Sequence, residues 1–599
     1  MIYFAQFSGG GKIDDSREKY QFTWNGKSRC IKIAQTPSTA TLRPCKEKSK
    51  NWDTTENLYI EGDNLEVLKQ LQKTYYGKVK MIYIDPPYNS GNNFIYPDNF
   101  KDNIYNYKKI SQQQSSSNPN TSGLFHTKWL NFMYPRLLLA KNLLKEDGVI
   151  YISIDDKELC NLKKICDEIF GENNFVANLV WQSTAGSNTG TDIVTITENI
   201  LVYTKNRLLA IFDGQLASDK SYNFVDEFIN ERGKYALDKL DRRRVGSHYS
   251  EALNYGIDMP DGSIRYPGGT KKRNQEGWNY LWSKAKVQWG LANGFIEFKE
   301  TNEGWNIYNK RYEKVDNEGN PVERTIPFRN LITLDQCNTA QGTAEVRKLF
   351  DFRGFDFPKP TTLIEHLMNT IVRKDKEALI LDFFSGSATT AHGVMKYNFK
   401  DKGNRKFIMV QLPELCSESS EAYENGLHNI CEIGEERIRR AGNQIKTEWE
   451  NEHPSDGLYA SEDKFNVDIG FKVFKLDSTN IVPWDSGAEY TEDNLFNLSD
   501  VFKANRSKED ILYEIMLKYG VFDKQVTEIE INGKTMYRVG RRYMIVCLED
   551  NIDSKDVKAI GELSPKTVVF KESGFTDDNA KINATYNLEK AGVEDIKCI

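Results

Sequence analysis

The chain has 599 residues, 39% hydrophobic and 28% charged, a composition typical of globular proteins with room for several domains. Its net charge of −6 gives no global positive field, so any contact with nucleic acid must come from local basic clusters. It has no apolar run long enough to span a membrane and no secretory signal, so we expect a cytoplasmic protein with no membrane-spanning segment. Its nine cysteines and six histidines show no metal-ligand spacing, so we expect no bound metal and no disulfides.

Residues 1–50 are predicted to form an N-terminal segment with little regular pattern. The glycine run that ends at Lys12 resembles a phosphate-binding loop only superficially, because that loop requires Ser or Thr after the lysine and Ile13 stands there. We therefore expect a flexible terminus rather than a nucleotide site.

A regular α/β pattern begins near residue 51. Residues 58–63 predict a short strand, and a helix with Leu65, Leu68 and Leu71 on one face follows. Asp63 ends the strand, where its carboxylate is a candidate contact for a nucleoside. Capping of the following helix explains this residue equally well.

The most informative stretch is Asp85-Pro86-Pro87-Tyr88, which follows an apolar, β-branched run at residues 79–84. Such a run predicts a buried strand of a parallel sheet, and open α/β sheets bind ligands at the carboxyl ends of their strands. The Asp85 carboxylate and the Pro86 carbonyl can each accept a hydrogen bond from an NH₂ group, which localises the lone pair of a weakly nucleophilic nitrogen for methylation. The prolines fix these acceptors, and Tyr88 can stack on a planar base. The alternative is a stiff turn in which Asp85 caps backbone amides.

Further alternating elements complete a predicted catalytic half-domain over residues 51–182. A polar loop around residues 112–120 is long enough to cover a site. Helical spacing of apolar residues from Trp129 to Leu144 then precedes a second buried strand at 149–154 and a helix at 157–170.

The composition changes over residues 183–350, where basic clusters alternate with aromatic residues. Basic side chains bind phosphates, Arg reads base edges and aromatic rings support splayed bases, so we predict an inserted DNA-recognition domain. A solvated face over a small aromatic core is the alternative. The candidate DNA-binding residues are Arg242, Arg243, Arg244, Lys271, Lys272 and Arg273, and they precede Trp278, Tyr280, Trp282 and Trp289.

A second signature lies at residues 377–390, within a predicted cofactor-binding half over residues 351–450. A buried strand runs into a turn of small residues and a helix begins near Thr389, which lets backbone amides approach a nucleoside cofactor. The turn lacks the glycine run that a pyrophosphate requires, so S-adenosylmethionine, which has no phosphate, fits better than NAD. The predicted contacts are Asp382, Phe384, Ser385, Gly386 and Ser387.

Two flanking segments are expected to add cofactor contacts. The strand at 406–412 ends just before Pro413, where Gln411 or Glu414 can bind ribose hydroxyls. Lys359 lies in the rigid segment Phe-Pro-Lys-Pro at 357–360, where its ammonium can meet the cofactor's carboxylate. A surface lysine before a helix is an equally consistent interpretation.

The remaining chain, residues 451–599, is predicted to form a small α/β domain. A helix at 430–445 precedes it, and it contains a helix at 511–517 and strands at 536–539 and 542–548. It carries no catalytic constellation, so we expect it to serve oligomerisation or partner docking.

The order of the motifs carries information of its own, because the Asp-Pro-Pro-Tyr loop comes first, the basic insert second and the Phe-Ser-Gly-Ser turn at 384–387 last. In this order the chain resembles the β class of amino-methyltransferases and, within it, the modification subunits of type III restriction–modification systems. The resemblance runs from about residue 18 to the C-terminus and includes residues 36–44, 57–68, 129–136, 152–156 and 435–441.

This resemblance implies a Rossmann-like, S-adenosylmethionine-dependent α/β fold with a mostly parallel sheet, permuted motif order, an inserted target recognition domain and a small α/β C-terminal domain. The implied reaction is metal-free methyl transfer to the N6 amine of adenine in a short asymmetric duplex site. Asp63 corresponds to the family's contact with the cofactor's adenine. The implied partners are double-stranded DNA, a second copy of the chain and a helicase–nuclease restriction subunit.

Two departures from the family leave alternatives open. Ala388 stands where the family usually has glycine, and the first sixteen residues do not resemble the family's longer N-terminal region, which puts dimer arms or part of DNA recognition in question. One alternative is cytosine N4 as the target. Another is an RNA or protein-glutamine methyltransferase, although these generally carry the cofactor turn before the catalytic loop. The third is a DNA-recognition subunit that Ala388 has made inactive.

Overall fold

The computed structural model describes residues 21–89, 121–186, 193–216, 222–244, 246–269, 271, 277–302, 304–453, 464–482 and 501–599. The chain divides into a central unit, Met1–Phe212 with Arg329–Ile599, and an inserted unit, Asp213–Phe328. The polar loop at 112–120, the first sixteen residues, Lys272 and Arg273 lie outside the described residues.

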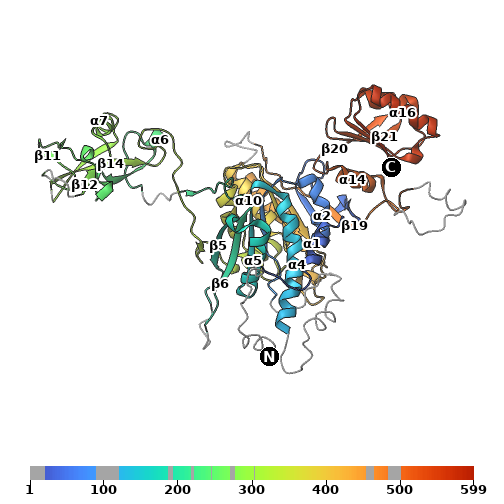
Figure 1. Ribbon diagram of the computed structural model, residues 1–599, viewed down its shortest axis with the longest axis horizontal. Coiled ribbons are helices and arrows are strands. Elements are labelled where there is room, and N and C mark those ends of the chain that lie inside the picture. Colours follow the sequence, from blue (N-terminus) through green and yellow to red (C-terminus); the bar gives the residue numbers. More distant parts are fainter. Residues whose placement is uncertain are drawn as a thin grey trace, which may run out of the picture. The chain divides into compact units, whose positions relative to one another are not determined.

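One large sheet organises the central unit (Figure 1). Within the described residues, ten strands are hydrogen-bonded in the order β1-β19-β2-β18-β17-β3-β4-β6-β5-β16. The strands from β19 to β4 are parallel, whereas β1 and β6 run in the opposite direction. The predicted α/β class with a mostly parallel sheet is therefore confirmed. The bounds are β1 Ala40–Pro44, β19 Lys472–Ser478, β2 Leu58–Glu61, β18 Lys406–Gln411, β17 Leu379–Asp382, β3 Val79–Ile84, β4 Leu144–Ile154, β6 Thr197–Thr204, β5 Phe175–Gln182 and β16 Leu331–Ile332.

The two halves of the central unit meet at two places in the sheet, between β3 and β17 and between β2 and β18, and the strands of each pair are far apart in the chain. Ile380 and Leu381 of β17 pair with Met81 and Ile82 of β3. Because both strands run in the same direction, the segments that follow them emerge at the same edge. The permuted motif order is thus compatible with one composite site.

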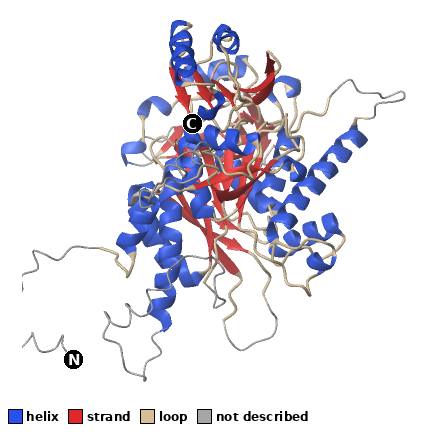
Figure 2. Ribbon diagram, turned by 90° about the vertical axis from the view of Figure 1, so that its right-hand side faces the viewer, coloured by secondary structure: helices blue, strands red, loops and turns tan. Residues whose placement is uncertain are grey.

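Helices cover both faces of this sheet (Figure 2). Ile82 and Ile84 of β3 belong to an apolar cluster with α2, α4 and α5, and Met81 and Tyr83 belong to a second cluster with α9, α10 and α12. This alternation follows from the two-residue repeat of a strand and buries the sheet on both sides. The bounds are α2 Asn64–Tyr75, α4 Thr121–Leu143, α5 Asp156–Phe170, α9 Thr361–Ile371, α10 Thr389–Asp401 and α12 Ile430–Glu452.

The C-terminal part of the chain contains its own sheet, as predicted. Its five strands in the described residues are hydrogen-bonded in chain order, and α15 and α16 cover one apolar cluster on it. The expected helix at 511–517 lies within α14 (Lys508–Tyr519). The bounds are β20 Val526–Ile531, β21 Lys534–Val539, β22 Met544–Cys547, β23 Thr567–Phe570, β24 Asp595–Cys598, α15 Ser554–Glu562 and α16 Asp578–Lys590.

The inserted unit has a small aromatic core of its own. Tyr235, Tyr280, Trp282, Phe295 and Tyr312 are buried together in it. For Tyr280 and Trp282 the structure therefore corrects the expectation that these rings are available to bases. The bounds are β8 Tyr235–Lys239, β9 Asp241–Arg243, β12 Trp278–Tyr280, β13 Ile296–Thr301, β14 Gly304–Tyr312 and α7 Lys284–Ala292.

The bounds of two domains, the insert and the C-terminal domain, differ from the sequence-based expectation. The insert was expected to cover residues 183–350, but β6 and β16 are strands of the central sheet and α8 (Thr339–Phe350) belongs to the central unit. Likewise β19, expected in the C-terminal domain, lies between β1 and β2. Both differences arise because hydrogen bonding to distant strands decides membership of a sheet.

No helix in the described ranges is long and apolar enough to cross a membrane. Those ranges also contain no group of three or more His, Cys, Asp or Glu side chains arranged to hold a metal ion. All nine cysteines are free thiols.

Candidate active site

The predicted catalytic and cofactor-binding residues gather at the carboxyl edge of the central sheet. Asp85 follows β3, Asp382 ends β17, Gln411 ends β18 and Asp63 comes two residues after β2. Since these four strands are parallel, their ends meet at one edge, which is the ligand-binding edge of open α/β sheets. The antiparallel β6 begins at this same edge and brings Glu198, which sequence analysis missed.

The loop that follows β3 is held by hydrogen bonds on several sides. The Tyr88 hydroxyl lies 2.7 Å from Asp85 Oδ1 and 2.9 Å from Glu198 Oε2. Trp129 Nε1 of α4 donates to the Pro87 carbonyl at 2.7 Å. Asn89, with φ of 56°, donates to the buried Glu158 of α5 at 2.5 Å. The acceptors that the sequence predicted are therefore carried on a fixed backbone.

Lys359 lies against this loop. Its Nζ donates to Glu198 Oε2 at 2.6 Å and to the Tyr88 hydroxyl at 2.7 Å, and it lies 3.4 Å from Asp85 Oδ1. Its side chain is 11% exposed, so the alternative of a plain surface lysine is wrong. The expected contact with a cofactor carboxylate stays a prediction.

The pKa values of the two carboxylates near Lys359 are shifted in opposite directions. Burial raises the pKa of Asp85, and the Lys359 ammonium only partly opposes this effect. Burial also acts to raise the pKa of Glu198, but Lys359 outweighs it and the pKa of Glu198 is lowered. The pKa of Lys359 is raised, because Asp85 and Glu198 outweigh the effect of burial. Asp85 is therefore the more basic of the two carboxylates that share this ammonium.

The turn that follows β17 is fastened by side chains of its own motif. Asp382 accepts hydrogen bonds from the Phe384 amide at 3.0 Å and from Thr390 Oγ1 at 2.6 Å, and burial raises its pKa to about 7. Gln411 Oε1 accepts from the Gly386 amide at 2.7 Å. Arg437 of α12 donates to Ser387 Oγ at 2.8 Å. Asp382 and Gln411 thus hold the shape of the turn, and any direct contact with a cofactor stays a prediction.

The residues at this edge are suited to a nucleoside cofactor. Glu414 lies three residues after Gln411, the last residue of β18, and is half-buried. Burial raises the pKa of its carboxyl group, and no hydrogen bond or ion pair joins its side chain to another described residue. Such a carboxylate can accept hydrogen bonds from ribose hydroxyls. Asp63 caps α2 through Oδ1, as the alternative interpretation expected, and its Oδ2 accepts from Arg136 of α4 at 3.1 Å. Its predicted contact with a cofactor base stays a prediction.

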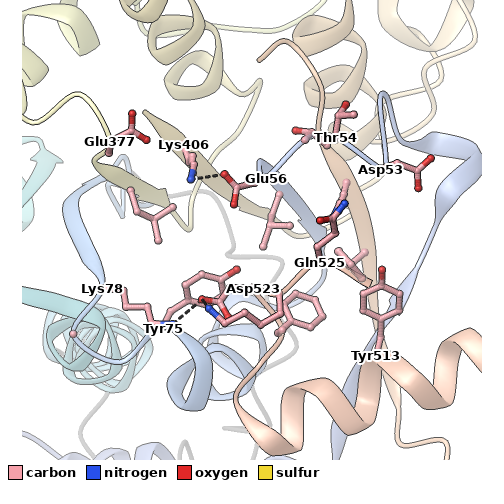
Figure 3. A pocket seen from close by; sticks show the side chains of 18 of the residues that line it. Asp53, Thr54, Glu56, Tyr75, Lys78, Glu377, Lys406, Tyr513, Asp523 and Gln525 are labelled. Atoms are coloured by element: carbon pink, nitrogen blue, oxygen red, sulfur yellow. Dashed lines mark hydrogen bonds and ion pairs between the residues drawn. The ribbon is translucent and has the colours of Figure 1, made fainter. Parts of the chain in front are cut away.

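A cavity of about 660 Å³ lies at the opposite edge of the sheet (Figure 3). It is lined by the first residues of β2, β17, β18 and β19, together with Asp523, which pairs with Lys78 at 2.7 Å. None of the predicted site residues lines it. Its mixed charge, with Lys406 paired to Glu56, gives it no preference for one sign of ligand.

The predicted DNA-binding residues that the structure describes are accessible on the inserted unit. Arg242 and Arg243 of β9 and Lys271 are exposed, and Arg244 is half-buried. A hollow of about 710 Å³ beside β9 is lined by the basic residues Arg242, Lys239 and Lys286 and by the acidic residues Asp238 and Asp241. Arg242, Arg243 and Lys271 therefore present exposed positive charge on this unit, although the hollow itself is of mixed charge and the net charge of the chain is negative.

Comparisons with known proteins agree with this geometry. A family model for N6/N4 methyltransferases, described as DNA methylase, matches residues 79–429. The chain is 34% identical over 487 residues to the StyLTI Mod subunit of a type III restriction-modification enzyme from Salmonella typhimurium, covering 78% of this chain and 67% of that one. It is 30% identical over 627 residues to the EcoPI Mod subunit of Escherichia phage P1, with 94% and 88% covered. It is 32% identical over 407 residues to the type II methyltransferase M.KpnI of Klebsiella pneumoniae, with 64% and 87% covered.

Proposed function

Because the chain belongs to the DNA methylase family, among the modification subunits of type III restriction–modification systems, and is an S-adenosylmethionine-dependent DNA methyltransferase, we propose that it methylates the N6 amine of adenine in a short asymmetric duplex site. The observation that carries this proposal is the Asp85-Pro86-Pro87-Tyr88 loop, fixed at the carboxyl edge of the sheet beside the turn after β17.

The loop supplies the groups that an exocyclic amine requires. The nitrogen lone pair of adenine N6 is delocalised into the ring, so the amine is a weak nucleophile. The Asp85 carboxylate and the Pro86 carbonyl accept its two N–H bonds, which localises the lone pair and orients the nitrogen. The target base reaches the loop by rotating out of the duplex, at a cost of a few kcal/mol, and stacks on Tyr88.

S-adenosylmethionine, when bound, supplies an electrophilic methyl group. Phe384 and the backbone of Ser385, Gly386 and Ser387 would line its site. Glu414 would accept its ribose hydroxyls, and Asp63 would contact its adenine. These residues are supported by their common position at the edge where β2, β17 and β18 end.

The inserted unit would hold the DNA. Arg242, Arg243, Arg244 and Lys271 would neutralise phosphates, which suits a protein whose net charge is negative. We propose that the chain acts in the cytoplasm as a homodimer that joins a helicase–nuclease restriction subunit, with residues from the C-terminal sheet available for assembly.

Incubation of the purified chain with mixed-sequence plasmid DNA and S-adenosylmethionine should produce N6-methyladenine. The reason is that only an amine can use the paired acceptors of the loop, and adenine N6 is the target that the family resemblance implies. Nucleosides are quantified by mass spectrometry after digestion, and a reaction without cofactor is the control. Formation of N4-methylcytosine instead would retain the mechanism and correct the base, whereas absence of both products would contradict the proposal.

Replacement of Ala388 by glycine should change S-adenosylmethionine affinity by less than about threefold. Ala388 has φ of 60° and is 0% exposed, and it packs in the apolar cluster with α9, α10 and α12, so we do not expect its methyl group to contact the cofactor. Relief of the left-handed backbone, about 1–2 kcal/mol, is at least as large as the loss from burying one methyl group less, about 0.8 kcal/mol, so the turn should keep its stability. Calorimetric titration of parent and variant tests this, and tenfold tighter binding by the variant would favour the inactive DNA-recognition alternative.

A further inference from the structure

Two carboxylates at the active site compete for the same two donors. The Tyr88 hydroxyl carries one proton but lies within hydrogen-bond distance of both Asp85 and Glu198. The Lys359 ammonium lies 2.6 Å from Glu198 Oε2 and 3.4 Å from Asp85 Oδ1. Glu198 therefore holds the ammonium more closely than Asp85 does, and it offers the hydroxyl a second acceptor.

Removal of Glu198 would leave Asp85 as the nearest anion to Lys359. The lysine side chain is flexible and its ammonium has three donors, so an approach of less than 1 Å converts the present 3.4 Å separation into a direct hydrogen bond. Both donors would then bind Asp85 Oδ1, and the direct ion pair would draw the carboxylate toward the lysine and make it a weaker acceptor for the target amine.

We propose that Glu198 is a positioning residue that draws the Lys359 ammonium and the Tyr88 hydroxyl away from Asp85, so that this carboxylate is free to accept the N–H bond of the target amine. This inference rests on the proposed function, and it deepens that function by adding a residue to the site. Tyr88 transfers its hydrogen bond from Asp85 to Glu198 when the base enters, and Lys359 stays paired with Glu198.

The groups around Asp85 determine how its pKa, and with it the pH dependence of methyl transfer, should respond to substitution. Tyr88 and Lys359 lie against Asp85, and Glu198, Tyr83 on β3 and Asp382 on β17 interact with it through their charges. Tyr83 is bonded to Ser153 and Asp382 to Thr390, and neither changes partner in this proposal. Glu198 raises the pKa of Asp85 and Lys359 lowers it, so their removal shifts this pKa in opposite directions.

The test compares Glu198→Gln, Lys359→Met and the double variant in single-turnover methylation of plasmid DNA at saturating S-adenosylmethionine. Glu198→Gln should lower the rate by about 10²-fold, because Lys359 then pairs with Asp85 and displaces this carboxylate from the position in which it accepts the N–H bond of the target amine. The acid limb of its pH–rate profile should move to lower pH, whereas that of Lys359→Met should move to higher pH. The double variant should be faster than Glu198→Gln alone, because the lysine that captures Asp85 is gone.

Glu146→Gln is the matched control, because it removes another Glu–Lys pair, 2.9 Å to Lys205, at the far end of the neighbouring strand β4. It should leave rate and pH profile unchanged. Affinities for S-adenosylmethionine by calorimetry and for DNA by fluorescence anisotropy should stay within about threefold in Glu198→Gln. If Glu198→Asp restores the rate, the result would support a positioning role for the carboxylate at residue 198 and show that the fold tolerates a substitution at this position.

The inference is overturned if Glu198→Gln keeps the parent rate, if its acid limb does not move, or if the double variant is no faster. A tenfold loss of S-adenosylmethionine affinity in Lys359→Met would overturn the assignment of Lys359 to the catalytic loop and restore the cofactor-carboxylate interpretation. If the parent chain itself forms no methylated nucleoside, the failure belongs to the proposed function.

Discussion

Asp85→Ala is expected to lower the rate of methyl transfer by about a thousandfold or more, the upper range for removal of a group that handles a proton in the transition state. In the proposed mechanism the residue would contribute in two ways. Its carboxylate would accept an N–H bond of the amine before reaction, and it would take the surplus proton from nitrogen after the new C–N bond has formed and the methyl–sulfur bond has broken. Because burial raises its pKa, it is a better proton acceptor than an exposed aspartate.

The variant should retain its affinity for DNA, because the basic residues assigned to DNA lie on the inserted unit. Single-turnover rates and anisotropy titrations on the same plasmid fragments measure the two quantities separately. Asp375→Ala is a matched control, since it removes a partly exposed carboxylate, 3.8 Å from Lys145, next to the amino end of β17. Near-normal transfer by Asp85→Ala would refute the catalytic assignment.

The position of Asp85, Asp63 and the 384–387 turn at one edge was predictable from local sequence pattern. Each follows a short apolar run, and runs buried on both faces occur in parallel sheets, whose carboxyl ends coincide. The helices α2, α4 and α5 were predictable for a similar reason, because their apolar residues recur at helical spacing. These features depend only on neighbours in the chain.

Glu198 was not predictable in this way. It is the second residue of an apolar strand, and a carboxylate at that position lies at the active-site edge only because β6 runs antiparallel to β4. Strand direction is decided by pairing between distant segments and leaves no local signal. Because pairing between distant segments leaves no local signal, the insert was also predicted to be longer than it is. For the same reason, the sequence did not show that Lys359 lies against Asp85 and Tyr88.

Trp129→Ala is expected to destabilise the central unit by about 3–5 kcal/mol, the usual cost of deleting a large buried aromatic side chain. Trp129 is 0% exposed and packs in the cluster that contains α2, α4 and α5. Its Nε1 also donates to the Pro87 carbonyl at 2.7 Å, so the catalytic loop loses a tether when the ring is removed. Differential scanning calorimetry should show a lower melting temperature, and methylation measured well below that temperature should also be slower.

Trp129→Phe separates the two contributions of this side chain. Phenylalanine retains most of the buried area but cannot donate to Pro87. We therefore expect Trp129→Phe to lose less stability than Trp129→Ala, about 1–3 kcal/mol, but to lose about as much methylation rate as Trp129→Ala does. Trp449→Ala on α12, which removes a half-buried ring stacked on His453, is the control for loss of an indole elsewhere and should cost about 1 kcal/mol. If Trp129→Phe were as active as the parent, the hydrogen bond to Pro87 would have no part in holding Asp85 and Tyr88 in position. The rigidity of the loop would then have to come from its two prolines and from the hydrogen bond between Asn89 and Glu158.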